Sequence, residues 1–254
     1  DSKEEITLEE IKRLIDEVAW FKPSIYFNGG EPTLRPDLLK AVEYAKKKKL
    51  IAAFPTNGSF MNESLAEKIV LSGLDFYSTS IDGPAEYHNK RRGFPNAYER
   101  ATQGIRYLVK VRDKLNRRTP HIRITCITDE KNIANSWHVL DLANELGVDE
   151  VAFGNLMFYP QEMEDSQRDF IKERGTGGEE MIGLGLENEK YLKADLSGLK
   201  DFYQKAEKES AIPVYFVLSC DDLDDFYSPK TPKFSRCLTP WMVATIQPNG
   251  DLTQ

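Results

Sequence analysis

Hydrophobic and polar positions alternate with two different periods over residues 1–158. After Thr7-Leu8-Glu9-Glu10, a capping-box pattern, apolar residues recur at helical spacing up to Val18. Short apolar runs that end at Gly, Asn, Asp or Pro predict strands instead. The pattern predicts helices at 8–21, 36–48, 63–72, 98–111 and 133–146, and strands at 24–27, 51–54, 76–81, 121–128 and 151–158.

This alternation of strand and helix predicts parallel strands joined by right-handed crossovers. Two architectures fit this alternation: a barrel or partial barrel, and an open doubly wound sheet. Both place ligands at the carboxyl ends of the strands, where special residues gather. These are Gly29-Gly30-Glu31-Pro32, Thr56-Asn57-Gly58 and Asp82-Gly83-Pro84. A run of such strand ends favours a ring of loops around one site.

The pattern loosens after residue 158, with a polar stretch at 160–195 and a helix at 196–208. A strand at 214–219 and another at 241–246 follow, and the second leads into a Pro248-Asn249-Gly250 turn. We divide the chain into residues 1–212, the βα series, and residues 213–254, the start of a small extension. Because the chain lacks an initiator Met and stops soon after a turn, we expect it to lack segments at both ends.

Composition narrows the class of protein. The formal net charge of −7 argues against general nucleic-acid binding. The longest uncharged stretch, residues 237–250, is too short for a transmembrane helix. The three cysteines are too few, and odd in number, which argues against a disulfide scaffold and favours a reducing cytoplasm.

Each candidate motif has a functional and a purely structural interpretation. Gly29 and Gly30 let a ligand approach the backbone, and Glu31 can accept from an ammonium group; a tight turn with a solvated Glu is the alternative. Asp82 and the hydroxyls before it can bind a sugar diol, or can form an ordinary polar strand end. An arginine of the 91–92 pair can hold a ligand carboxylate, or can be surface charge.

Other chemistry-bearing residues give weaker signals. No two of the three histidines have metal-ligand spacing, and the acidic residues of 221–225 are more typical of a solvated loop than of a cation site. Cys126 is expected to be a buried apolar residue, and Cys220 has no assigned role. Hydrolase, P-loop and dinucleotide signatures are absent from the sequence.

Taken together, the motifs resemble those of the radical SAM superfamily, from about Thr7 to Phe158 and again at Cys237. Gly29-Gly30-Glu31-Pro32 is similar to the family's GGEP motif, which binds the amino group of S-adenosylmethionine. Thr56-Asn57-Gly58 and Ser80-Ile81-Asp82-Gly83-Pro84 resemble the TNG and S-[IL]-D-G-P segments that follow it.

The resemblance also implies roles for single residues. Residues 87–93 are similar to the H-[DN]-x-x-R-G stretch, which assigns the methionyl carboxylate to Arg92. Ser80 and Asp82 would face the ribose, and Asn57 belongs to the same cofactor-binding set. Leu156 and Met157 stand where relatives contact adenine. These residues would position the cofactor, and no catalytic acid or base is assigned.

The fold that the resemblance implies is a partial (βα)6 TIM-like barrel of parallel strands whose first strand is missing. The family's C-x3-C-x2-C loop, which holds the catalytic 4Fe–4S cluster, is expected before residue 1. Cys237-x12-Gly250-x4 is similar to the opening of a SPASM or twitch extension. Cys237 would then ligate an auxiliary 4Fe–4S cluster together with cysteines beyond residue 254.

The implied activity is reductive cleavage of S-adenosylmethionine to a 5′-deoxyadenosyl radical, which takes a hydrogen atom from a peptide, protein or small-molecule substrate. An electron donor such as ferredoxin or flavodoxin would supply the electron. We expect the full-length protein to bind iron and the 254-residue chain alone to be inactive and to hold little cluster. Two alternatives stay open: an unrelated TIM-barrel lyase or isomerase, and a barrel that lacks the cluster and acts as a binding scaffold.

Overall fold

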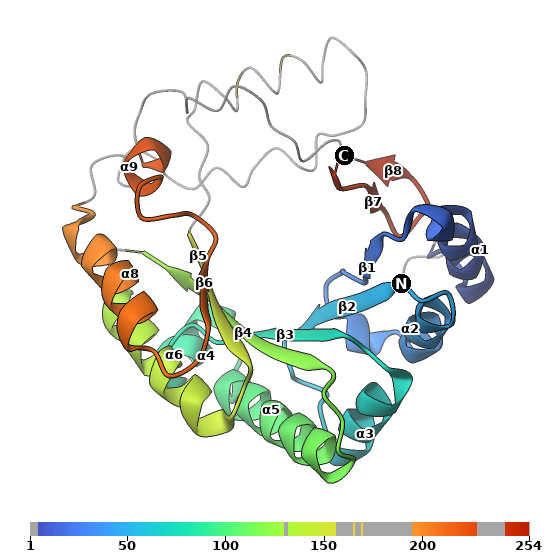
Figure 1. Cartoon of the computed structure of the whole chain (residues 1–254), viewed down its shortest axis with the longest axis horizontal. Helices are drawn as coiled ribbons and strands as arrows, with labels where there is room; N and C mark the ends of the chain where they lie inside the picture. Colours follow the sequence, from blue (N-terminus) through green and yellow to red (C-terminus); the bar gives the residue numbers. More distant parts are fainter. Residues whose placement is uncertain are drawn as a thin grey trace.

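A computed structural model describes residues 5–129, 132–155, 165, 169, 195–227 and 242–253. Six strands form one sheet in chain order, and each strand pairs in parallel with the next. Figure 1 shows that the sheet curves around a central space and that the helices lie outside it. The predicted partial barrel is therefore confirmed, and the open doubly wound sheet is not formed. The strands are β1 (Ser24–Tyr26), β2 (Ile51–Thr56), β3 (Phe76–Ser80), β4 (His121–Thr128), β5 (Glu150–Asn155) and β6 (Val214–Phe216).

Within the described residues, the helices follow the strands as the βα pattern predicts, with two additions. Thr7 caps the first helix through the expected capping box, because Glu10 N–H donates to Thr7 Oγ1 at 3.3 Å and Thr7 N–H donates to Glu10 Oε2 at 2.7 Å. The helices at 85–92 and 223–226 were not predicted, and the second lies in the predicted acidic loop. The helices are α1 (Leu8–Val18), α2 (Leu38–Lys47), α3 (Glu63–Ser72), α4 (Ala85–Arg92), α5 (Ala97–Lys114), α6 (Ile133–Leu146), α8 (Ser197–Glu209) and α9 (Leu223–Phe226), with 3-10 turns η1 (Ala19–Phe21) and η2 (Pro32–Leu34).

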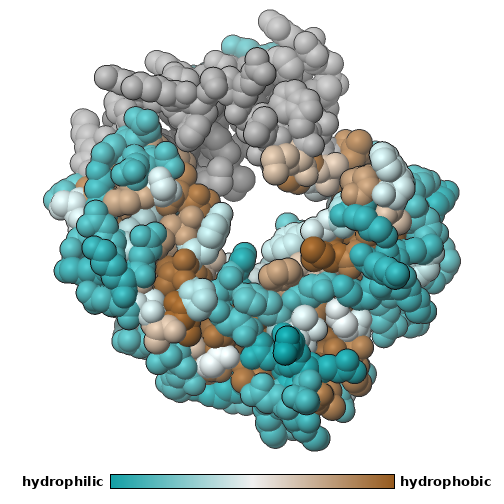
Figure 2. Space-filling view, viewed as in Figure 1, coloured by the Kyte–Doolittle hydropathy of each residue, from teal (hydrophilic) through white to brown (hydrophobic). Residues whose placement is uncertain are grey.

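The hydrophobic core lies between the sheet and the outer helices. Phe54, Tyr77, Ile124 and Phe153 come from four neighbouring strands, and each is fully buried on the helix-facing side. Side chains along a strand alternate between the two faces of the sheet, and β4 shows this as a strict alternation of half-buried and buried positions. The half-buried positions therefore face the central space, which Figure 2 shows as an opening between the two sides of the barrel.

The sixth strand corrects the predicted domain boundary. We expected the barrel to end at residue 212 and residues 213–254 to form the extension. Instead, β6 pairs with β5, with Val151 opposite Val214, so the barrel sheet continues past residue 212. The barrel strand that we expect before residue 1 stays a prediction. Packing explains the placement, because the Phe216 ring stacks on Tyr203 of α8 with centroids 3.8 Å apart.

The predicted turn at Pro248-Asn249-Gly250 joins two short antiparallel strands, β7 (Thr245–Ile246) and β8 (Leu252–Thr253). Gln247 N–H donates to the Asp251 carbonyl at 2.8 Å, which closes the hairpin. The hairpin is tied to the chain before α1, because Ile6 N–H donates to the Pro248 carbonyl at 2.7 Å. Its assignment to a SPASM or twitch extension stays a prediction. Among the described residues, no helix is both long enough and apolar enough to cross a membrane.

Gly58 provides a test of how closely α5 packs against the loop after β2. A Cβ at Gly58 would lie 2.9 Å from the Cα of Ala101, and the residue has φ +74°. Gly147 has a similar φ of +68°, but its nearest neighbour would be an ordinary 3.9 Å away. Gly58→Ala should therefore lower the free energy of unfolding by about 1–3 kcal/mol more than Gly147→Ala, measured by urea denaturation. If the two variants lose the same free energy of unfolding, α5 can move away from residue 58 without a cost in stability.

Candidate functional site

Glu31 connects the loops that follow β1 and β2. Its Oε1 atom accepts from Thr56 Oγ1 at 2.7 Å and from Thr33 N–H at 3.1 Å, and it also contacts the Thr33 hydroxyl. Its Oε2 atom accepts from Asn57 N–H at 2.7 Å. The carboxylate therefore fixes the glycine-containing loop against the Thr56-Asn57-Gly58 turn at the carboxyl edge of the sheet.

The glycines before Glu31 lie open to solvent. Gly29 and Gly30 are exposed, and no atom lies within 4 Å of the position where either would carry a Cβ. Pro32 is buried and begins η2. Asn57 is exposed, and its Oδ1 accepts from Ser59 N–H at 2.8 Å, which leaves the side-chain amide hydrogens as donors for a ligand. Gly29, Gly30 and Asn57 therefore present backbone and amide groups on one open surface.

Ser80 stands at the end of β3 on the face toward the central space. It is half-buried, and its Oγ lies 3.2 Å from the Thr125 hydroxyl on β4. Its neighbour Thr79 points the other way, is buried, and donates to the Thr56 carbonyl at 2.7 Å. The hydroxyl of Ser80 is thus the polar group that β3 offers to a ligand at this edge.

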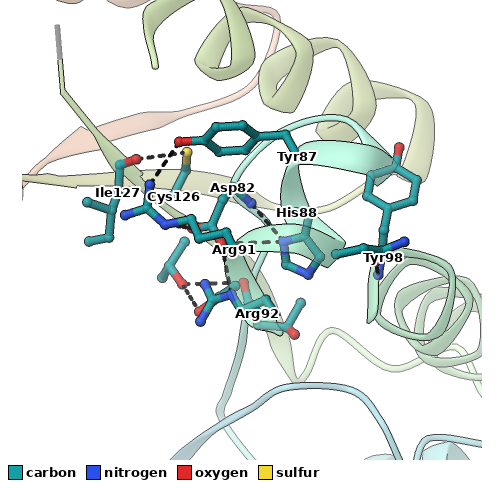
Figure 3. Close-up of polar contacts among 12 residues, drawn as sticks. Asp82, Tyr87, His88, Arg91, Arg92, Tyr98, Cys126 and Ile127 are labelled. Atoms are coloured by element: carbon teal, nitrogen blue, oxygen red, sulfur yellow. Dashed lines mark hydrogen bonds and ion pairs between the residues drawn. The ribbon is translucent and has the colours of Figure 1, made fainter. Parts of the chain in front are cut away.

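Asp82 departs from its predicted role. Its side chain is fully buried beneath α4, and Arg92 Nε donates to its Oδ2 at 2.8 Å (Figure 3). Arg91 Nε lies 3.8 Å from Oδ1 on the other side of the carboxylate. A carboxylate with 0% exposure presents no atom to a ribose in this arrangement. The structure therefore gives Asp82 an ion pair with Arg92 in place of the ribose contact that the resemblance implies.

The charges around Asp82 decide its protonation state. Burial by itself would raise the pKa of Asp82, but hydrogen bonding to His88 and the positive charges of Arg92 and Arg91 outweigh it and lower the pKa below its ordinary value. His88 Nδ1 lies 3.1 Å from the Asp82 N–H and 3.4 Å from Oδ2. One ring nitrogen cannot accept from the first and donate to the second at once, and the shorter contact favours the acceptor role. The two arginines are then the principal groups that keep Asp82 ionised.

The remaining predicted residues fall into two groups. Leu156, Met157 and Cys237 lie outside the described residues, so their predicted roles stay predictions. Cys126 is buried, as expected, and burial raises the pKa of its thiol to about 12. Cys220 is half-buried, with its Sγ 3.9 Å from Gln204 Nε2. Within the described ranges, no group of three or more His, Cys, Asp and Glu side chains could hold a metal ion.

Comparison with known proteins decides the family. The profile described as "Radical SAM superfamily" matches residues 1–119, which contain every cofactor-binding residue predicted before β4. Residues 1–119 belong to the radical SAM superfamily. The predicted resemblance is confirmed, and the named relatives in this superfamily are enzymes.

Two relatives come from Methanosarcina barkeri. An AdoMet-dependent heme synthase is 30% identical over 210 residues, which are 82% of this chain and 52% of that protein. An Fe-coproporphyrin III synthase is 32% identical over 155 residues, 61% of this chain and 37% of that protein. The chain therefore spans about half, or less, of the length of the curated radical SAM relatives that it matches.

A solved structure supports the fold. The crystal structure of Streptococcus suis SuiB superimposes with a TM-score of 0.53 at 15% sequence identity, over 69% of this chain and 43% of that chain. At this identity the likeness concerns the radical SAM fold alone. It agrees with the six parallel strands of the partial barrel.

Whether Glu31 joins the loops after β1 and β2 can be tested by measuring the stability of a variant. Glu31→Gln should lower the free energy of unfolding by about 1–3 kcal/mol, because its amide nitrogen would face N–H and O–H donors that now meet an acceptor. Glu67→Gln, on the exposed side of α3, is the control and should change little. Urea denaturation measures the free energy of unfolding of both variants. If this free energy is unchanged in Glu31→Gln, the two loops are not joined through this carboxylate.

Proposed function

We propose that this chain binds S-adenosylmethionine across the carboxyl ends of β1, β2 and β3, as part of an enzyme that cleaves it reductively. The observation that carries the proposal is that four groups gather after strands that end at one edge of the sheet. The open glycine backbone and Asn57 lie on loops, Ser80 ends β3, and Arg92 ends the helix that follows β3. A 4Fe–4S cluster, held by cysteines expected before residue 1, would supply the electron for breaking the carbon–sulfur bond. The residues of this chain bind and orient the cofactor.

The charges at this edge suit the two ends of the methionyl group. Oε1 of Glu31 already has three donors, whereas Oε2 has Asn57 N–H, so Oε2 is the atom with capacity for an ammonium group. Arg92 uses Nε for Asp82, which leaves its two terminal nitrogens for a bidentate pair with a carboxylate. Ser80 would then meet the ribose, and Asn57 would donate its amide hydrogens to the cofactor.

The inner wall of the barrel supports a proposal for the substrate class. Tyr26, Phe76 and Tyr215 are 56%, 40% and 54% exposed, although each lies within a strand of the sheet. Their neighbours along the strands pack into the core, so these rings face the central space. Large apolar side chains that stay exposed within a concave surface indicate a binding surface for an apolar ligand.

One guanidinium group accompanies these rings. Arg123 stands between Ser78 and Glu150 in the row of paired residues that faces the central space. Its Nε contacts Glu150, and its guanidinium carbon lies 5.9 Å from the centre of the Tyr215 ring. The row is two residues, or about 7 Å, from Ser80 along β3. A ligand with an apolar framework and carboxylate groups could contact the aromatic rings and pair with the guanidinium group of Arg123.

We therefore propose a tetrapyrrole carboxylate as the substrate class, within the predicted range of peptide, protein or small molecule. The names of the two Methanosarcina barkeri relatives, a heme synthase and an Fe-coproporphyrin III synthase, support this choice. An auxiliary cluster at Cys237 and a ferredoxin or flavodoxin as electron donor remain parts of the proposal that rest on family resemblance.

The cofactor site is tested in the full-length protein, prepared without oxygen and reconstituted with iron and sulfide. With dithionite it should convert S-adenosylmethionine to 5′-deoxyadenosine. Arg92→Ala should keep the iron content and weaken S-adenosylmethionine binding roughly ten- to a hundredfold, the loss of one charge-assisted contact. Lys90→Ala, exposed on the same helix, is a cleaner control than Arg91→Ala, because Arg91 also faces Asp82. Unchanged affinity in Arg92→Ala would contradict the assignment of the carboxylate.

The substrate class is tested by titrating coproporphyrin III into the same protein and following the Soret absorbance. Arg123→Met should weaken binding at least tenfold, by loss of a charge-assisted contact, while binding of the tetramethyl ester, which lacks carboxylates, should not change. Arg106→Met, on the outer face of α5, is the control. If the wild-type protein forms 5′-deoxyadenosine but binds no coproporphyrin, the tetrapyrrole class is wrong and a peptide substrate becomes the next candidate.

A further inference from the structure

We propose that Asp82 is a positioning residue for S-adenosylmethionine, which acts by fixing the guanidinium group of Arg92. The inference rests on the proposed function in one respect, that Arg92 binds the methionyl carboxylate. It differs from the sequence-based prediction, because Asp82 acts through another side chain and does not touch the ribose.

The ion pair between Asp82 and Arg92 joins a buried anchor to an exposed binding group. Arg92 Nε donates to Asp82 Oδ2 at 2.8 Å, and the side chains are 37% and 0% exposed. An exposed arginine at the end of a helix has many rotamers, and ordering one costs up to about 2 kcal/mol. With Nε held, the plane of the guanidinium group is set before a ligand arrives.

Asp82 itself is held by its surroundings. It lies two residues after the end of β3, and its backbone N–H donates to Nδ1 of the buried His88 at 3.1 Å. The next residue is Gly83, where a Cβ would lie only 2.7 Å from the Cβ of Asn135 on α6. The close approach of α6 and the contact with α4 leave the loop little room to move. The carboxylate is therefore fixed relative to Ser80 at the end of the same strand.

The terminal nitrogens of Arg92 are the donors that this cluster offers to an anionic ligand. Asp82 faces two cations, with Arg92 at 2.8 Å and Arg91 at 3.8 Å. Arg91 is also acted on by the negative charge of Asp129. Arg92 pairs with Asp82 through Nε, so its two terminal nitrogens remain for a ligand, and a carboxylate is the methionyl group that they would bind.

The experiment compares two ligands in the full-length, iron-loaded protein by calorimetry. Asp82→Asn should weaken binding of S-adenosylmethionine about tenfold, the lower end for one charge-assisted contact, and should leave binding of decarboxylated S-adenosylmethionine within about twofold. Asp82→Asn combined with Arg92→Ala should bind no more weakly than Arg92→Ala alone, because both changes remove one coupled contact. Asp149→Asn breaks the pair with Arg112 before β5 and should leave both affinities unchanged.

The outcomes separate this inference from the proposed function. If Arg92→Ala weakens S-adenosylmethionine binding and Asp82→Asn does not, the inference is wrong and the proposed function stands. If Arg92→Ala has no effect, the proposed carboxylate contact itself fails. Equal weakening of both ligands by Asp82→Asn would mean general damage to the loop and would overturn the positioning role.

A second pair of variants serves if Asp82→Asn does not fold. Arg92→Lys keeps a positive charge, but its ammonium group would be drawn to the buried Asp82 carboxylate. It should therefore bind S-adenosylmethionine as weakly as Arg92→Met. If Arg92→Lys retains most of the wild-type affinity, a free cation is sufficient and Asp82 does not position it.

Discussion

Parallel hydrogen bonding among β1, β2 and β3 is the constraint on which the site depends. Parallel neighbours all end at the same edge of a sheet, so the loops after these strands are brought together although they are far apart in sequence. Two carboxylates then hold the loops in place. Glu31 joins the first to the second, and Asp82 joins the end of β3 to α4. The open backbone, amide and guanidinium groups are arranged by these contacts before any ligand binds.

The two faces of each strand have different roles: one packs in the core, and the other faces the central space. On β3, Tyr77 and Thr79 are buried against the helices, whereas Ser78 and Ser80 face the central space. Because side chains alternate with period two, a shift of one residue in the strand register would exchange these roles completely. The site therefore depends on the same register that forms the core, and a stable core preserves the spacing between Ser80 and Arg123.

Much of this arrangement could be predicted from local sequence, and the failures have physical reasons. The strand ends at Gly29, Asn57 and Ser80 are marked by turn residues, so their shared edge follows from the βα alternation alone. The helix α4 was missed because its eight residues, AEYHNKRR, carry no apolar stripe. Burial of Asp82 could not be predicted because it is produced by α4, so an apparently exposed acid at a strand end was assigned to a ligand.

Local charge matters more than net charge in this chain. The formal net charge is −7, yet two arginines share one buried carboxylate beside the open loops, and Arg123 projects from the inner wall. A cation held by a fixed carboxylate keeps its orientation, whereas a cation on a free side chain must be ordered when the ligand binds. Both Arg92 and Arg123 contact a carboxylate through Nε, with Asp82 and Glu150 as partners. In each case the pair orients the terminal nitrogens in advance, and the proposed binding of anionic groups at two separate positions depends on this orientation.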